Sequence, residues 1–163
     1  MLQGFKFRQQ PELAKVLAPL LAMQVIRAYQ RLHQPLPQQL VAMPQSKARW
    51  LQRGYNQAAL LCDQLYELLP LAYQVGLMRR LGKHAEQHKL QAAERWEHAQ
   101  RTMYCTAPLA GQSIALVDDI VTTGASMTAA AQALKRRGAG VVDGWALAYT
   151  LPPALQPQLD ESS

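Results

Sequence analysis

The chain has little cysteine and no apolar run long enough to cross a membrane. Its two cysteines, Cys62 and Cys105, stand alone among apolar residues, which predicts buried free thiols and argues against a disulfide or a metal site. The amino terminus, with Lys6, Arg8 and Glu12, lacks the apolar core of a signal peptide. These absences argue against secretion and membrane insertion, and they predict a cytoplasmic protein.

The sequence also lacks a metal-ligand cluster and a dinucleotide-binding motif. His84 and His88 lie four residues apart and could share a helix face, but no third ligand accompanies them. We therefore interpret them, with His33 and His98, as surface residues. The absence of G-x-G-x-x-G disfavours a dinucleotide fold. There is no internal repeat, and no linker is long enough to separate two domains.

The composition is that of a globular protein. A hydrophobic fraction of 49% and a charged fraction of 17% over 163 residues predict one domain, over residues 1–152, with a sheet between two helical layers. The tail, residues 153–163, contains proline and acids and is expected to fray. The net charge of +6 favours an anionic partner, such as a pyrophosphate, a nucleotide or a nucleic acid, without choosing among them.

The most informative stretch runs from Ile114 to Ser126. It starts with four consecutive apolar residues, as expected of a central parallel strand that helices cover on both faces. Asp118 and Asp119 follow at the carboxyl end of this strand, where open α/β sheets bind ligands. We expect this acid pair to hold sugar hydroxyls or a hydrated divalent cation such as Mg²⁺.

Small and hydroxyl-bearing residues follow the acid pair and precede a helix, which the spacing of Met127, Ala130 and Leu134 predicts. The backbone N–H groups of this loop, its hydroxyls and the helix dipole would converge on one point, which suits a phosphate monoester. The predicted phosphate loop consists of Thr122, Thr123, Gly124, Ala125 and Ser126.

This stretch resembles the phosphoribosyl pyrophosphate (PRPP) motif of type I phosphoribosyltransferases, in which apolar residues and two acids precede a Thr-Thr-Gly-Ala-Ser loop. One alternative is a strand and a capped helix without a ligand, because Ser and Thr are common helix caps. Another is a response-regulator receiver, but its acid pair lies near the start of the domain, whereas here few residues follow the pair. An acid pair joined to a hydroxyl-rich loop favours the PRPP interpretation.

A basic segment, residues 45–57, is the second candidate for binding an anion. We expect a loop in which Gly54 permits close backbone approach, followed by a helix from about 57 to 69 that Asn56 caps. The alternative is a solvated charged loop. The positive charge would come from Lys47, Arg49 and Arg53.

Residues 53–57, Arg-Gly-Tyr-Asn-Gln, resemble the R-G-F/Y-N-Q signature of the ComF family, whose carboxyl-terminal domain is a phosphoribosyltransferase. This signature precedes the PRPP motif here, as it does in that family. The resemblance extends from about Gly4 to Tyr149. It implies an α/β fold of the type I phosphoribosyltransferase kind, with a mostly parallel central sheet and flanking helices.

The remaining elements follow from hydrophobic periodicity and from breakers. A helical pattern extends to about Leu32, and Pro19 would kink it or divide it into two short helices. Short strands are predicted at residues 40–43, 75–78 and 141–150, the first and last of which stop at prolines.

The polar segment from Arg79 to Arg95 is where the implied fold would close a mobile hood over the diphosphate. Cations there would stabilise the charge on departing pyrophosphate, although a solvated helix with interspersed glutamates is the alternative. Gly82, His84 and His98 stand where the family pattern has an Arg, a Thr and an Asn, so binding and catalysis are separate predictions. The hood candidates are Arg80, Lys83, Lys89 and Arg95.

We predict that the chain binds PRPP with Mg²⁺. In the enzymatic interpretation it transfers the phosphoribosyl group to a nitrogen nucleophile with release of pyrophosphate, using Asp118, Asp119 and Arg53. One alternative is a non-catalytic ComF-type protein of DNA uptake or processing, which would contact single-stranded DNA or the competence machinery. Another is a regulator that senses PRPP.

Two further expectations come from the resemblance. Phosphoribosyltransferases often pair, so a homodimer is expected. ComF-family chains usually begin with a four-cysteine zinc module, and this sequence has none. A truncated family member and a natural short form are the two alternatives.

Overall fold

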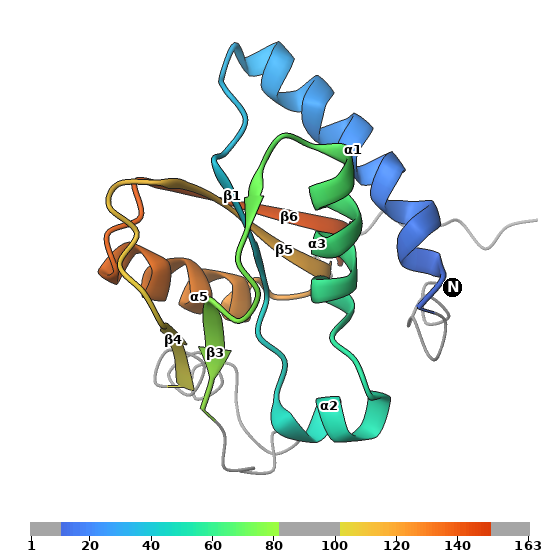
Figure 1. The fold of residues 1–163 in the computed structure, drawn as a ribbon, viewed down its shortest axis with the longest axis vertical. Helices are drawn as coiled ribbons and strands as arrows, with labels where there is room; N and C mark the ends of the chain where they lie inside the picture. The colour runs from blue at the N-terminus through green and yellow to red at the C-terminus, as the bar shows by residue number, and fades with distance from the viewer. Residues whose placement is uncertain (1–10, 82–101, 151–163) are drawn as a thin grey trace, which may run out of the picture.

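The computed structural model describes residues 11–81 and 102–150. Figure 1 shows its helices arranged around one central sheet. The elements, in chain order, are α1 (Leu13–Leu32), β1 (Gln39–Ala42), α2 (Lys47–Arg53), α3 (Gln57–Leu68), β2 (Ala72–Tyr73), β3 (Met78–Arg80), β4 (Met103–Cys105), β5 (Ser113–Val121), α5 (Ala125–Arg136) and β6 (Val141–Tyr149).

The central sheet has four strands, and every pairing in it is parallel. The strand order is β2-β1-β5-β6, so β5 is hydrogen-bonded to β1 on one side and to β6 on the other. β3 and β4 form a separate antiparallel pair. The prediction of an α/β fold with a mostly parallel central sheet and flanking helices is confirmed.

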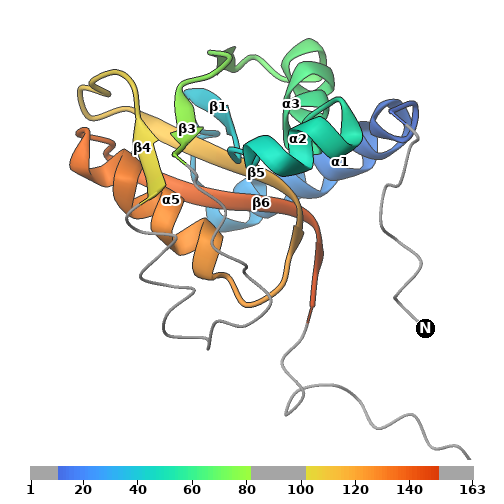
Figure 2. The same cartoon turned by 90° about the horizontal axis from the view of Figure 1, so that it is seen from below.

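Two apolar clusters lie on the two faces of β5, because alternate side chains of a strand point in opposite directions. Ile114 and Leu116 pack with α5 and with β3 and β4, whereas Ala115 and Val117 pack with α1 and α3. Figure 2 shows α5 on one side of the sheet and α1 and α3 on the other. All four side chains have no exposed surface, as the continuous apolar run predicted.

The first helical pattern forms one continuous helix, α1. The sequence predicted that Pro19 would kink this helix or divide it into two, and the prediction of two helices was wrong. Pro19 lies inside α1, where it has no N–H to donate and its ring crowds the carbonyl group one turn earlier. Tertiary packing compensates for this loss, because buried side chains lie on both sides of the proline. They are Ala14, Ala18, Leu21, Ala22 and Val25.

The second half of α1 is fastened to β6. The Tyr29 hydroxyl donates a hydrogen bond to Asp143, and the Tyr29 ring makes an edge contact with the buried Trp145, with 6.1 Å between the ring centroids. Burial and the bond to Asp143 raise the pKa of Tyr29 to about 12. Within residues 11–81 and 102–150, no helix combines the length and the apolar character needed to cross a bilayer.

Both cysteines are buried free thiols, as the sequence predicted. Cys62 lies in the cluster under α1 and α3, where burial raises the pKa of its thiol. Cys105 lies in the cluster under α5, and its Sγ is 3.2 Å from the carbonyl oxygen of Ala107.

Three boundaries differ from the sequence prediction. Much of the basic segment is helical, as α2, where a loop was expected. β5 continues to Val121, so the acid pair lies within the strand rather than after it. The strand expected at 75–78 is displaced, because Gly76 adopts a left-handed backbone with φ of 74° and turns the chain before β3.

Gly140→Ala is expected to destabilise the fold. The turns before β5 and before β6 are locked together, since Gly140 N donates to Gln112 O at 2.8 Å and Gly111 N donates to Gly138 O at 2.7 Å. A Cβ at position 140 would collide with the backbone carbonyl of Gly111, which has no rotamer through which to move. We expect the free energy of unfolding to fall by about 2 kcal/mol, measured by urea denaturation.

Gly144→Ala is the matched control for that prediction. An added Cβ there would lie 3.4 Å from the side chain of Met127, which can rotate away. Its effect on the urea midpoint is expected to be less than half that of Gly140→Ala. Equal effects of the two substitutions would contradict the backbone collision as the cause.

Candidate functional site

The acid pair lies in the second half of β5, close to the carboxyl end of the parallel sheet. Asp118 Oδ1 accepts a hydrogen bond from the N–H of Asp119 at 2.9 Å, and Asp119 Oδ1 accepts one from the N–H of Ile120 at 2.9 Å. One oxygen of each carboxylate is therefore held by the backbone N–H of the next residue in the strand. The other oxygen of each has no hydrogen bond to a backbone N–H that the structure identifies.

The two carboxylates interact strongly. Burial, together with the hydrogen bond and the negative charge of Asp119, raises the pKa of Asp118 to about 7, against the weaker opposing effects of the Asp119 N–H and the Arg49 charge. Two carboxylates this close are most easily accommodated when one holds a proton or when a cation lies between them. The site thus attracts positive charge or hydroxyl donors.

The predicted phosphate loop lies directly beyond the acid pair and is open to solvent. Thr122, Thr123 and Ser126 are exposed. Gly124 has φ of 76°, a left-handed conformation that lets the chain turn into α5, and the Thr123 hydroxyl oxygen accepts from Ala125 N at 3.4 Å. α5 begins without a side-chain cap from Gly124, so the positive end of its dipole faces this loop.

Two predicted arginines that are far apart in the sequence come close to each other, and one of them, Arg49, also acts on the acid pair. Arg49 comes from α2 and Arg80 from β3, and the charge of Arg49 acts on both Asp118 and Arg80. Burial and the neighbouring Arg49 lower the pKa of Arg80. Two guanidinium groups that repel each other would be stabilised by a polyanion.

Residues 53–57 fix the basic segment to the sheet. Gly54 ends α2 with φ of 79°, and Asn56 caps α3 by accepting from Ala58 N at 3.1 Å, as predicted. The Asn56 amide also donates to the carbonyl oxygen of Met43 at 2.9 Å, which ties the start of α3 to the end of β1. Arg53 donates to the buried side chain of Gln57. The motif therefore has a structural role that the sequence alone did not reveal.

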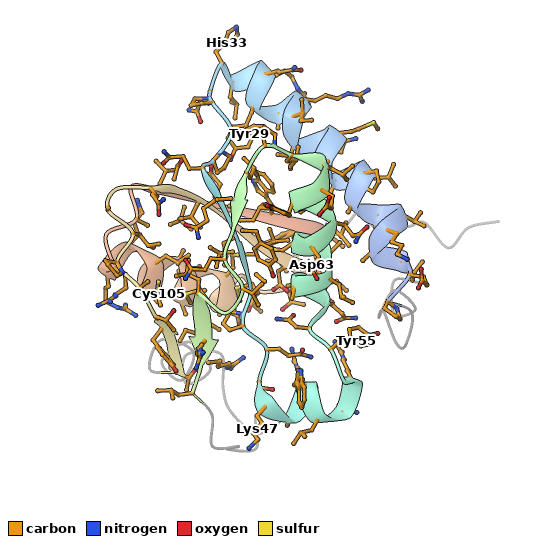
Figure 3. The ribbon with its side chains drawn as sticks, viewed as in Figure 1. Tyr29, His33, Lys47, Tyr55, Asp63 and Cys105 are labelled. Atoms are coloured by element: carbon orange, nitrogen blue, oxygen red, sulfur yellow. The ribbon has the colours of Figure 1, made fainter. Side chains whose placement is uncertain are left out.

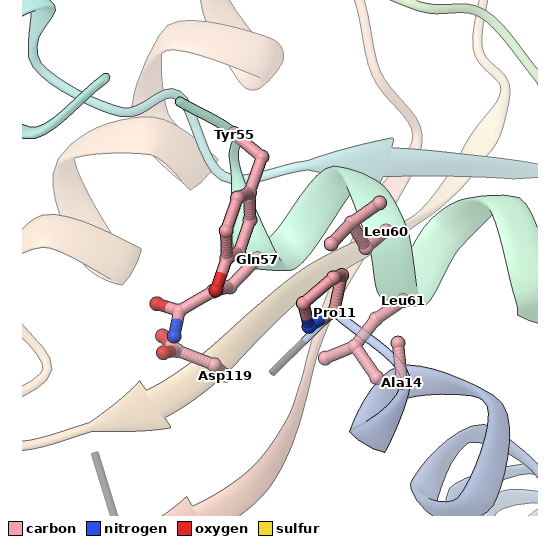
Figure 4. Close-up of a pocket in the computed structure, with 7 residues that line it drawn as sticks. All are labelled: Pro11, Ala14, Tyr55, Gln57, Leu60, Leu61 and Asp119. Atoms are coloured by element: carbon pink, nitrogen blue, oxygen red, sulfur yellow. The ribbon is translucent and has the colours of Figure 1, made fainter. Parts of the chain in front are cut away.

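A hollow opens on the other side of the acid pair, between α1 and α3. Figure 4 shows the side chains of Tyr55, Gln57 and Asp119 lying together at one end of it. Sequence reasoning gave no site role to Tyr55 or Gln57; their place in the Arg-Gly-Tyr-Asn-Gln motif was the available signal. The hollow is lined by Pro11, Ala14, Tyr55, Gln57, Leu60, Leu61 and Asp119.

The other cations predicted for the site either point away from the sheet or lie outside the described residues. Lys47 is exposed, and Figure 3 shows its side chain pointing away from the sheet, at the start of α2. Lys83, Lys89 and Arg95 lie outside the described residues, as does the tail from 153 to 163. The structure thus brings Arg49 near both Asp118 and Arg80, and Arg53 is held by Gln57.

The donor set fits a hydrated Mg²⁺ and does not form a complete metal cage. Mg²⁺ keeps several waters and is usually bound through one or two carboxylates together with phosphates of the substrate. Asp118 and Asp119 supply two carboxylates, and in the described part of the chain no three His, Cys, Asp or Glu residues cluster as a metal site would require. A metal here would depend on its ligand's phosphates.

Comparison with known proteins identifies relatives over most of the chain, although no family model matches. The chain is 35% identical over 151 residues to DNA utilization protein YhgH of Salmonella typhi, covering 93% of this chain and 66% of the relative. It is 31% identical over 152 residues to competence protein F of Haemophilus influenzae, covering 91% and 66%. The chain belongs to the ComF family. It spans 66% of the length of each of these relatives.

Solved structures similar to this ComF-family chain are phosphoribosyltransferases. Hypoxanthine phosphoribosyl transferase of Trypanosoma cruzi has a TM-score of 0.51 at 12% identity, covering 91% of this chain and 79% of that one. Hypoxanthine phosphoribosyltransferase of Staphylococcus aureus has a TM-score of 0.50 at 11% identity, covering 91% and 78%. At such identities the similarity establishes the type I phosphoribosyltransferase fold and nothing about substrate.

Proposed function

We propose that this ComF-family chain binds PRPP with Mg²⁺ and transfers its phosphoribosyl group to a nitrogen nucleophile, releasing pyrophosphate. One observation carries the proposal: the acid pair in the second half of β5 is followed, two residues on, by an exposed hydroxyl loop that opens into the start of α5. A phosphorylated sugar needs these two kinds of group side by side, since carboxylates accept hydrogen bonds from hydroxyls and the loop donates to phosphate.

Each part of the ligand has a matching group in this assignment. The 5′-phosphate lies in the loop from Thr122 to Ser126. The ribose hydroxyls, or water on Mg²⁺, are held by Asp118 and Asp119. The diphosphate lies toward Arg49 and Arg80, where it relieves the repulsion between the two guanidinium groups.

The proposed reaction needs no covalent nucleophile. The bond between the anomeric carbon and the pyrophosphate oxygen breaks with its electron pair on oxygen, and the nitrogen lone pair forms the new bond. Positive charge then develops on the sugar and negative charge on the leaving group, so fixed carboxylates and arginines stabilise both. Mg²⁺, when bound, would neutralise part of the diphosphate charge.

A second candidate is a non-catalytic role in DNA uptake or processing. The names of the relatives favour it, since they are a DNA utilization protein and a competence protein. A regulator that senses PRPP is a third, which would keep the site and lack turnover. For all three candidate functions we also propose that the protein is cytoplasmic and forms a homodimer.

Calorimetric titration with PRPP and Mg²⁺ tests the proposed function. We expect PRPP to bind in the micromolar to millimolar range and its binding to depend on Mg²⁺. Unphosphorylated ribose, titrated as a control, should give no heat of binding. Absence of binding at millimolar PRPP would contradict both the enzyme and the sensor.

Pyrophosphate release separates the enzyme from the sensor. The purified chain is incubated with PRPP, Mg²⁺ and a panel of nucleobases and amines, and pyrophosphate is measured with a coupled assay. Release above the rate without acceptor supports transfer. Binding without release for any acceptor supports the sensor and contradicts the enzymatic proposal.

A further inference from the structure

Positive charge is concentrated in one part of the sequence. Residues 13–62 contain no Asp or Glu at all, although they contain six of the lysines and arginines. This segment alone therefore has a formal charge equal to the +6 of the whole chain. Three of its six cations belong to one short helix, α2, and are Lys47, Arg49 and Arg53.

α2 is not part of the hydrophobic core. None of its residues is buried, and none appears in either apolar cluster. Trp50 nevertheless has 52% of its surface exposed, and Leu51 has 66%. Packing does not account for a tryptophan left so open on a helix that the core does not require.

The helical repeat divides α2 into two faces. Arg49 and Arg53, four residues apart, share the inner face, since the Arg49 charge acts on Asp118 and Arg53 donates to Gln57. Lys47 is three residues from Trp50 and four from Leu51, so these three share the opposite, outer face. Figure 1 shows α2 standing apart from the sheet and the other helices.

We propose that the outer face of α2, formed by Lys47, Trp50 and Leu51, binds single-stranded nucleic acid. An exposed aromatic ring beside a lysine suits such a strand, because the ring stacks a base and the lysine neutralises a phosphate. α2 carries three cations and no acid, which argues for a polyanion over a protein partner. The partner is single-stranded because duplex bases are already stacked on each other.

This inference deepens the second candidate function and rests on it, while it is independent of PRPP binding. Because Trp50 and Arg49 lie on different faces of α2, a strand on the outer face leaves the acid pair and the phosphate loop accessible. The strand would pass beside the candidate PRPP site without occupying it.

Fluorescence anisotropy with a labelled (dT)20 strand tests the proposal on the full chain. Trp50→Ala is expected to weaken binding about tenfold or more, whereas Trp50→Phe keeps a stacking ring and most of the affinity. Lys47→Gln should lower the slope of log affinity against log salt concentration by about 0.7. Leu20→Ala on α1 is the matched control, since Leu20 is also 52% exposed.

The outcomes of these measurements show whether single-stranded DNA binds the chain and whether it binds at α2. Binding of (dT)20 that Trp50→Ala leaves unchanged would overturn the assignment to α2 while keeping a DNA role, and absence of any binding would overturn both. A wild-type dimer that Trp50→Ala converts to a monomer, with (dT)20 affinity unchanged, would assign the face to a second copy. PRPP titration of Trp50→Ala should match the wild type, so failure of the PRPP proposal is scored separately.

Discussion

Replacing both carboxylates, Asp118→Asn with Asp119→Asn, is expected to weaken PRPP binding at least about 100-fold, because two hydrogen bonds to charged groups are lost. The amide side chains keep the size of the carboxylates but cannot hold a divalent cation or accept from sugar hydroxyls on both oxygens. Calorimetry with PRPP and Mg²⁺ measures the loss.

The fold of this double variant is expected to survive. The backbone of β5 stays paired to β1 and β6, and the four apolar residues before the acid pair are unchanged. Circular dichroism and a thermal melt check this. Asp63→Asn, which removes an exposed carboxylate from α3, is the control for lost charge alone. Unchanged PRPP affinity in the folded double variant would refute the role given to the acid pair.

Asp118→Asn alone is expected to stabilise the fold at alkaline pH, by up to about 4 kcal/mol at pH 8. The pKa of Asp118 is raised from 3.8 to about 7 in the folded chain, chiefly by burial. Above pH 7 the folded state must therefore hold a charge that burial disfavours, and asparagine removes that charge. Stability gained at the cost of ligand binding is common where a site is tuned for function.

The pH dependence has a defined sign. A raised carboxyl pKa means that the folded state binds the proton more tightly than the unfolded state, so wild-type stability falls as the pH rises from about 4 to 7. The advantage of Asp118→Asn should be largest above pH 7 and shrink as the pH is lowered towards 4. Urea denaturation of both proteins across this range gives the difference, and an advantage that grows on acidification would contradict the buried charge.

The local chemistry of the candidate site could be predicted because it is written in consecutive residues. A strand, an acid pair, a hydroxyl loop and a helix follow one another between Ile114 and Ser126, and each was recognised from its own composition. The cap of α3 was accessible for the same reason, because the Asn56 side chain satisfies a backbone group two residues away. Interactions between residues that are close in the sequence can therefore be predicted from the sequence.

Contacts between distant segments could not be predicted in this way. Nothing in the sequence indicates that Arg49 lies close enough to affect both Asp118 and Arg80, since α2 comes near these residues only in the folded chain. The continuity of α1 through Pro19 was missed for a related reason. A proline's local cost is visible in the sequence, whereas the packing of α1 on α3 and β6 that offsets it is not.

The sequence by itself determined the buried central strand, the helices at α1, α3 and α5 and the kinds of group that follow the strand, because these depend on side-chain polarity and on turns a few residues long. It did not determine α2, β2 or β4. Only the tertiary structure decided which cations reach the acid pair and which face solvent. It placed Arg49 and Arg53 on one face of α2 and left Lys47, Trp50 and Leu51 on the other, because a helix distributes neighbouring residues around its axis and only the rest of the fold selects the side that faces the acid pair.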